Sequence, residues 1–209
     1  MTGERPVVFV VDDDERVRDA LASLLASAGL DVMVFGSATD FVTADRPDAP
    51  ACLILDLQLP DVSGLELQKH LAEGDAPPIV FITGHGDVPS SVKALKAGAI
   101  DFLSKPFGAD ELLRAVDAAI AQDRAVRLKR AEHVELTGRF RRLTPRERQV
   151  LAFVVAGCAN KWTASELGTS EITIGVHRGQ IMRKMQARSL AELIRWADKL
   201  GVRPHEPAE

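Results

Sequence analysis

The chain has 209 residues, of which 46% are hydrophobic and 27% are charged, and a formal net charge of −4 at pH 7, as is ordinary for a globular protein. No apolar run approaches the roughly 20 residues that cross a bilayer, and the polar N-terminus has no signal-peptide pattern, so we expect a cytoplasmic protein. Cys52 and Cys158 lie far apart in apolar contexts, which favours buried thiols over a disulfide.

The net charge conceals two halves of opposite sign. Residues 1–122 contain 9 Lys/Arg and 20 Asp/Glu, whereas residues 139–203 contain 13 Lys/Arg and 5 Asp/Glu. This split indicates two domains with different partners, and the basic half is suited to a polyanion. We therefore expect one domain at 5–121, a helical linker at 122–138, a second domain at 139–203 and a tail at 204–209.

Short apolar runs alternate with helical patterns through the acidic half. The runs are rich in β-branched residues and nearly continuous, which is typical of strands buried on both faces of a parallel sheet. Five strands and five helices in strict alternation predict a doubly wound α/β domain with a five-stranded parallel sheet of the flavodoxin-like class. The expected strands are 7–11, 31–35, 52–56, 78–83 and 99–104.

From residue 122 onward the patterns are helical only. Seven of the fourteen residues in 122–135 are charged, which predicts an exposed linker helix; a coiled-coil dimer seam is the alternative, although no heptad is sustained. Thr144, Pro145 and Glu147 form a helix start with a capping box. Three more helical patterns follow, with a tight turn at 168–170 between the second and third helices. Four short helices around such a turn predict an all-α helix-turn-helix domain.

Polar side chains follow four of the expected strands. Asp12 and Asp13 end the first strand, Asp56 ends the third, Thr83 ends the fourth, and Lys105 follows the fifth. Because ligands of open parallel sheets bind at the carboxyl ends of the strands, we expect these side chains to converge. Hard oxygen ligands around a small site suit Mg²⁺, or Mn²⁺, and a shared phosphoryl group.

Each of these side chains also has a simpler interpretation. Residues 12–14 could form a solvated turn, Asp56 a strand-end cap and Lys105 a surface charge, but their joint convergence favours a site. An aspartyl phosphatase of the haloacid dehalogenase type also uses a strand-end aspartate. It needs a second aspartate two residues later, where this chain has Gln58. Residues 84–86 lack the spacing of a dinucleotide-binding loop.

The strand ends carry four motifs that resemble, in order, the receiver domain of bacterial two-component response regulators. The motifs are VDDD (11–14), DLQLPDVSG (56–64), FITGHGDVP (81–89) and KPF (105–107). The resemblance implies that a sensor histidine kinase phosphorylates Asp56 and that Mg²⁺ is the cofactor. It also implies that Asp13, Asp56 and the backbone carbonyl of Gln58 ligate the metal directly, with Asp12 acting through water.

Three further residues take roles from the same resemblance. Lys105 would pair with the phosphoryl oxygens, and Thr83 would hydrogen-bond one of them. Phe102 occupies the aromatic switch position of the family, and the family has a cis peptide at the position of Lys105–Pro106. Phosphoryl transfer needs an in-line nucleophile and positive charge on the equatorial oxygens, which the metal and Lys105 would supply.

The basic half resembles the LuxR/FixJ-type DNA-binding domain in LTPRE, the ANK step, the SE-T-VH-R core and ARSLAEL, all within residues 143–193. The whole chain thus resembles a NarL/FixJ-type response regulator. The resemblance implies a homodimer on phosphorylation, promoter DNA as ligand, the third helix of the domain in the major groove, and RNA polymerase as a further partner. The expected DNA-contacting residues, with the four Lys/Arg at phosphates, are Lys161, Thr173, Gly175, Val176, His177, Arg178, Gly179, Arg183 and Lys184.

Gly175 and Gly179 depart from the family pattern, which usually has lysine at the first position and often a long polar residue at the second. With Ile172 and Val176 they form a helix face that is poor in side-chain donors. Two interior glycines also cost a helix about 1 kcal/mol each. Two interpretations stay open: drift at an idle face, or close approach of the helix backbone with methyl contacts to thymine.

The expected function is therefore that of a phosphorylation-activated, DNA-binding regulator of transcription. Such a protein is not an enzyme, beyond catalysing its own phosphoryl transfer and dephosphorylation. Two other classes stay open. One is a phospho-switched protein-interaction regulator that does not bind DNA, and the other is a metal-dependent aspartyl phosphatase that turns over small phosphate esters.

Overall fold

The computed structural model describes residues 5–72, 74, 76–84 and 88–205, with residues 88–90 described by their backbone. Three positions of the fourth-strand motif, His85, Gly86 and Asp87, lie outside the described residues. The chain folds into two compact units that divide between Arg127 and Leu128. None of the described helices is long and apolar enough to cross a membrane.

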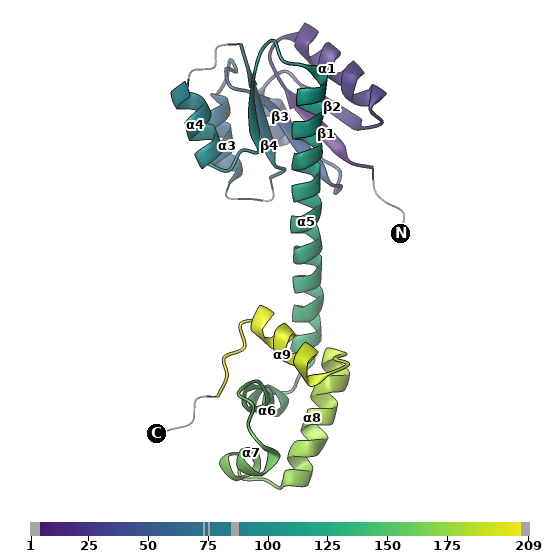
Figure 1. The fold of residues 1–209 in the computed structure, drawn as a ribbon, viewed down its shortest axis with the longest axis vertical. Helices are drawn as coiled ribbons and strands as arrows, with labels where there is room; N and C mark the ends of the chain where they lie inside the picture. The colour runs from purple at the N-terminus through teal and green to yellow at the C-terminus, as the bar shows by residue number, and fades with distance from the viewer. Residues whose placement is uncertain (1–4, 73, 75, 85–87, 206–209) are drawn as a thin grey trace. The chain divides into compact units, whose positions relative to one another are not determined.

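The first unit is a five-stranded parallel sheet with helices on both faces, which confirms the predicted fold class (Figure 1). The strand order is β2-β1-β3-β4-β5, so the order reverses between β1 and β3. Strands and helices alternate along the chain as β1 (Val7–Val11), α1 (Glu15–Ser27), β2 (Asp31–Phe35), α2 (Ala38–Thr43), β3 (Ala51–Asp56), α3 (Gly64–Leu71), β4 (Ile79–Thr83), α4 (Val88–Lys96), β5 (Asp101–Ser104) and α5 (Ala109–Arg141).

Side chains of the central strands alternate between two apolar cores. Val7, Phe9 and Val11 of β1 pack with α2, α3 and α4, whereas Val8 and Val10 pack on the other face with α1 and α5. β1, β3 and β4 are buried throughout, as continuous apolar runs predict. For β2 and β5 that prediction is wrong, because these strands lie at the edges of the sheet and are only partly buried.

Helix α5 is tied to the first unit at the opposite end of β3 from Asp56. The buried Asp123 carboxylate accepts hydrogen bonds from the backbone N–H of Ala51 (2.9 Å) and from Arg127 Nε (2.7 Å). Burial, and then the charge of Asp123, raise the pKa of the neighbouring Cys52 thiol. Both cysteines of the chain are free, as predicted.

The middle of α5 is exposed, and its last turns belong to the second unit. Val126, Leu128 and Val134 are 55%, 72% and 64% exposed, in the stretch where the sequence predicts an exposed helix. Leu136 is buried, and Arg139 Nη1 donates a hydrogen bond to the Met185 carbonyl at 3.2 Å. The end of α5 therefore packs with the helices that follow it.

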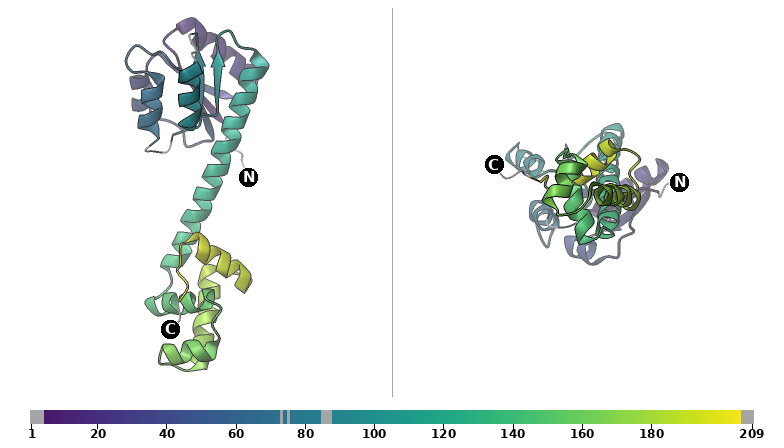
Figure 2. Two further views of the ribbon diagram at one scale, coloured as in Figure 1. Left: turned by 60° about the vertical axis from the view of Figure 1, so that its left-hand side comes forward. Right: turned by 90° about the horizontal axis from the view of Figure 1, so that it is seen from below.

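The second unit is all α, as predicted (Figure 2). Its helices pack around one apolar core. Glu147 completes the predicted capping box: its backbone N–H donates to Thr144 Oγ1 at 3.2 Å, and its carboxylate accepts from the Thr144 N–H at 2.7 Å. Gly168, with a φ of +60°, makes the tight turn before the third helix. Cys158 is half-buried rather than fully buried, because it lies in the loop between two helices. The helices are α6 (Pro145–Val155), α7 (Asn160–Glu166), α8 (Glu171–Met185) and α9 (Leu190–Lys199).

Candidate functional site

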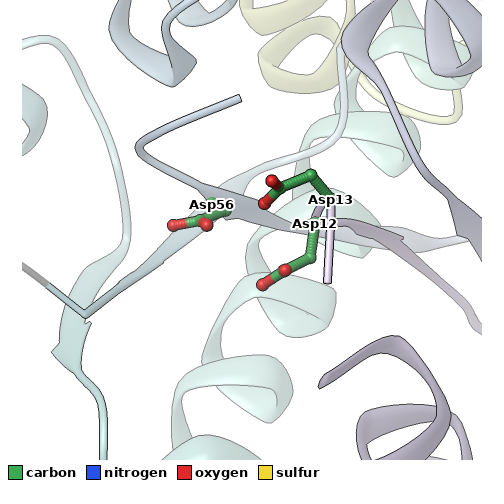
Figure 3. Close-up of side chains that lie close together, drawn as sticks. All are labelled: Asp12, Asp13 and Asp56. Carbon is green, nitrogen blue, oxygen red and sulfur yellow. The ribbon is translucent and has the colours of Figure 1, made fainter. Parts of the chain in front are cut away.

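Three carboxylates meet at the carboxyl edge of the sheet, where the strand order reverses. Asp12 and Asp13 follow β1 and Asp56 ends β3, and these two strands pair in parallel with Val11 opposite Leu55. One oxygen from each carboxylate lies within 4.8 Å of the others (Figure 3). Asp12 and Asp56 are buried, whereas Asp13 is exposed. The structure thus brings together the three acidic residues that the sequence analysis assigned to metal binding.

Lys105 places its ammonium against this cluster. Its Nζ lies 2.6 Å from Asp12 Oδ2 and 3.5 Å from Asp56 Oδ2. Its backbone N–H donates to the Thr83 carbonyl at 2.7 Å, which joins the ends of β4 and β5. The Lys105–Pro106 peptide bond is cis, as the family resemblance implies. One ammonium against three carboxylates leaves an excess of negative charge, which favours a further cation.

Asp56 carries a buried oxygen without a hydrogen bond. Burial raises the pKa of Asp56 above its ordinary value; the charge of Lys105 opposes this shift, and the charge of Asp12 adds to it. The Oδ1 atom of Asp56 is buried and accepts no hydrogen bond from any described residue. Because an unpaired buried carboxylate oxygen costs free energy, a cation at this atom would be favoured. The set of hard oxygen donors fits Mg²⁺.

An open pocket of about 380 Å³ gives access to the cluster. Gln58, whose backbone carbonyl the resemblance assigns to the metal, is exposed at this pocket, while Thr83 is buried at the end of β4 beside it. A phosphoryl group has room there next to Asp56. The lining residues are Asp13, Asp56, Gln58, Leu59, Pro60, Gly84 and Lys105.

Two residues that the sequence analysis did not single out shape the site. Arg18 Nη1 donates to the backbone carbonyls of Asp12 and Asp13 at 2.8 and 2.9 Å, so α1 holds the turn that carries both carboxylates. Gly64 begins α3 against β3, and an added Cβ there would lie 2.5 Å from the Asp56 carbonyl oxygen. The glycine in the motif DLQLPDVSG was an available signal for close approach. Nothing in the sequence distinguishes Arg18 from an ordinary helical surface cation.

Phe102, the predicted switch residue, lies half-buried on β5 beside Phe81 of β4, with ring centroids 6.3 Å apart. Phe81 in turn approaches the start of α3, because its Cε1 would lie 3.0 Å from a Cβ added at Gly64. A row of contacts therefore leads from Phe102 to the backbone that carries Asp56. This row connects the predicted switch residue with the strand that ends in Asp56.

The predicted DNA-contacting residues lie on α7 and α8 and differ in how free their side chains are. Lys161 and Arg183 are exposed, although the Arg183 guanidinium contacts a glutamine of its own helix. Arg178 Nη1 donates to Asn160 Oδ1 at 3.0 Å. The Thr173 hydroxyl lies 2.9 Å from the hydroxyl of the serine that caps α8. Lys161 and Arg183 are thus the two most accessible cations of the predicted set.

Lys184 is held by a buried carboxylate of its own unit. Its Nζ lies 2.8 and 2.6 Å from the two carboxylate oxygens of Glu147, which is 4% exposed. Burial raises the pKa of Glu147, but hydrogen bonds from Lys184 and Thr144 more than offset this, so the pKa lies below its ordinary 4.5. The structure therefore gives Lys184 a role inside its unit, and its contact with DNA stays a prediction.

Part of the solvent-facing side of α8 is apolar. Ile172 and Val176 are 81% and 57% exposed, and both helical glycines, Gly175 and Gly179, are exposed beside them. His177 is half-buried at the edge of this face. The predicted reading face is thus accessible but offers few hydrogen-bond donors.

Comparison with protein families agrees with both units. The model of the response regulator receiver domain matches residues 8–117, and the model of bacterial regulatory proteins of the luxR family matches residues 141–197. Nodulation protein W of Bradyrhizobium diazoefficiens is 48% identical over 199 residues, which cover 95% of this chain and 88% of that protein. Response regulator protein TodT of Pseudomonas putida is 46% identical over 201 residues, which cover 96% and 88%.

Solved structures show the same relationship over nearly the whole chain. The structure of the response regulator StyR is 47% identical, with a TM-score of 0.85, and the match covers 94% of this chain and 100% of that one. Full-length FixJ from B. japonicum is 41% identical, with a TM-score of 0.57, and the match covers 96% and 98%.

Proposed function

The chain belongs to the response regulators that carry a receiver domain and a LuxR-type DNA-binding domain, and we propose that phosphorylation of Asp56 controls its binding to promoter DNA. A sensor histidine kinase supplies the phosphoryl group. The phosphorylated form dimerises, binds its site and regulates transcription through RNA polymerase. The observation that carries this proposal is the buried Asp56, with one oxygen unpaired, at an open pocket beside Lys105 and two further carboxylates.

The acidic cluster would hold a divalent metal. Asp13, Asp56 and the backbone carbonyl of Gln58 would bind Mg²⁺ or Mn²⁺ directly, with Asp12 acting through water. When bound, the metal supplies positive charge to the carboxylates and to the phosphoryl oxygens. The unpaired Asp56 Oδ1 and the excess negative charge of the cluster both support this assignment.

Asp56 supplies the nucleophile. A carboxylate oxygen attacks the phosphorus of the kinase phosphohistidine, a P–O bond forms as the P–N bond breaks, and the imidazole leaves. Lys105 Nζ, which lies 3.5 Å from Asp56 Oδ2, pairs with a phosphoryl oxygen. The Thr83 hydroxyl donates to another phosphoryl oxygen. Both interactions stabilise charge that develops on the transferring group.

Labelling by a small phosphodonor tests the assignment of Asp56. Full-length protein is incubated with radiolabelled acetyl phosphate in Mg²⁺, and the stable incorporation of phosphate is measured. The Asp56→Asn variant should lose all labelling, because an amide is a poor nucleophile and a weaker metal ligand. Labelling of this variant at the wild-type level would contradict the proposal.

Asp14→Asn is the matched control for that experiment. Asp14 belongs to the same acidic run, but its carboxylate caps α1 by accepting the Arg16 N–H at 2.9 Å, and asparagine caps a helix equally well. This variant should label like the wild type. The same assay tests the enzyme question, since continuous turnover of acetyl phosphate at a rate typical of a phosphatase would favour the aspartyl phosphatase class instead.

A second candidate function, a regulator that binds a protein rather than DNA, is favoured by one observation. The exposed face of α8 is apolar around Ile172 and Val176, and apolar surface is also common at protein interfaces. Binding to duplex DNA that weakens steeply with salt would support the DNA-binding function. Capture of a protein partner together with no binding to any duplex would support the second candidate.

A further inference from the structure

One side of α8 faces away from the core of its unit. Ile174, Ile181 and Met185 are buried in that core. The residues on the opposite side of the helix follow the spacing i, i+4, i+7 and i+11, which places them on one stripe. We call them the α8 stripe: Ile172, Val176, Gly179 and Arg183, all exposed.

The first turns of the α8 stripe present carbon rather than donors. Ile172 and Val176 are 81% and 57% exposed, and neither belongs to the apolar core of the unit. The hydroxyl of Thr173, which follows Ile172 in the chain, lies 2.9 Å from Ser170 Oγ. A partner that docks on these turns is therefore met by methyl groups.

The glycines on and beside the stripe are not required by the fold. Gly175 and Gly179 lie inside a regular helix, and a Cβ added at either position would meet no described atom within 4 Å. Glycine also weakens a helix relative to alanine. Because nothing inside the unit demands them, their effect is outward: they lower the surface and let a partner approach the helix backbone.

We propose that the α8 stripe reads thymine methyl groups in the major groove, so that the specific half-site carries thymines opposite Ile172 and Val176. The inference rests on the proposed DNA-binding function and names the base edge that is recognised. The 5-methyl group of thymine is the apolar feature among the major-groove edges of the four bases. The charge of the unit selects DNA as the partner, since residues 139–203 contain 13 Lys/Arg and 5 Asp/Glu and exposed Lys161 and Arg183 can reach phosphates.

Deoxyuridine provides the test, because it lacks only the methyl group of thymidine. Full-length protein with Mg²⁺ and acetyl phosphate selects duplexes from a randomised pool, and the best duplex is then made with thymine or with uracil. Wild-type protein should lose about fourfold in affinity for each contacted thymine that is replaced, as expected for one methyl-sized apolar contact. In the double variant Ile172→Ala/Val176→Ala, the ratio of the affinities for the thymine duplex and the uracil duplex should fall toward one. Its binding to unselected DNA and the salt dependence of that binding should persist.

The outcomes separate this inference from the function on which it rests. Equal wild-type affinity for the thymine and uracil duplexes overturns the inference and leaves the proposed function standing. If no duplex is retained from the pool even at low salt, the proposed function fails and the inference fails with it. Both replaced side chains are exposed, and circular dichroism should show an unchanged helix content in the double variant.

Gly175→Lys with Gly179→Lys tests the close approach. Two long side chains would lift the helix from the groove floor, so the ratio of specific to nonspecific affinity should fall, even though nonspecific affinity gains from the added charge. Gly138→Lys is the matched control, since Gly138 is an exposed helical glycine of the same unit with open space around it. That variant should keep the wild-type ratio. A ratio that rises in the α8 variant would overturn the close approach and identify the glycines as drift.

Discussion

The acidic site at the carboxyl edge of the sheet and the exposed face of α8 differ in how many contacts they make within the chain. At the edge of the sheet, Lys105 pairs with Asp12 and Asp56, and Gly64 lies against the backbone of Asp56. On α8, Ile172 and Val176 are exposed, and the glycines beside them have open space. Folding therefore organises most of the first site from within the chain, whereas Ile172 and Val176 on the second surface stay outside the apolar core of their unit. An added side-chain atom at the first site should therefore strain the folded protein, whereas one on the exposed face of α8 should not.

The largest expected effect probes an exception to this comparison, the Lys184–Glu147 pair inside the second unit. Lys184→Met leaves the buried Glu147 carboxylate unpaired and should lower the free energy of unfolding by about 3 kcal/mol, the lower end of the range for buried pairs, because the Lys184 side chain is 26% exposed. Urea unfolding followed by tryptophan fluorescence measures this, since both tryptophans, Trp162 and Trp196, lie in this unit.

The pH dependence and a control sharpen that measurement. The pKa of Glu147 is lowered in the folded state, so the pair stabilises the protein above pH 4.5, and this contribution is lost as pH falls further through the folded-state pKa. The difference between wild type and Lys184→Met should therefore shrink in acid. Lys199→Met removes a pair with Glu132 that is about half exposed and should change stability little. Equal losses in the two variants would show that burial does not matter here.

The next effect concerns Lys105 at the acidic site on the carboxyl edge of the sheet. Lys105→Ala should slow labelling by acetyl phosphate about a hundredfold, as expected when one charge-stabilising donor is removed from a reaction site. Mg²⁺ binding should be retained, because the carboxylates remain and a competing cation is gone. Dimerisation at a matched extent of phosphorylation should be lost, because no ammonium is left to pair with the phosphoryl oxygens of Asp56. Light scattering measures this step.

The control for Lys105 is Lys69→Ala, which removes an exposed lysine of α3 away from the pocket. It should label and dimerise like the wild type. Phosphorylation-dependent dimerisation that persists unchanged in Lys105→Ala would refute the role given to this ammonium.

The smallest effect compares glycines of the two regions directly. Gly64→Ala places a Cβ 2.5 Å from the Asp56 carbonyl oxygen, and the resulting strain should cost the first unit about 2 kcal/mol. Gly179→Ala meets open space and should stabilise the second unit by about 1 kcal/mol through helix propensity. Calorimetry of the full chain measures both transitions. Two changes of the same sign would break the contrast between the two regions.

Sequence patterns were most informative where a feature depends on residues near one another. The capping box of Thr144 and Glu147 spans three residues and is present as predicted. The convergence of Asp12, Asp13 and Asp56 followed from one rule, because parallel strands place their carboxyl ends at one edge. Edge strands were not predicted in this way: DVMVF is apolar at four of its five positions, yet the strand order leaves β2 partly exposed.

The sequence by itself determined the alternating sheet, the four-helix unit and the acidic edge, because hydrophobic period, caps and strand ends are written in short stretches of chain. Only the tertiary structure decided which polar groups and glycines contact residues from distant parts of the chain. Lys184 meets Glu147, 37 residues away; Arg18 turns back to the carbonyls of Asp12 and Asp13; and Gly64 meets the backbone of β3. Such contacts depend on how distant segments pack, and no local pattern encodes the distance between them.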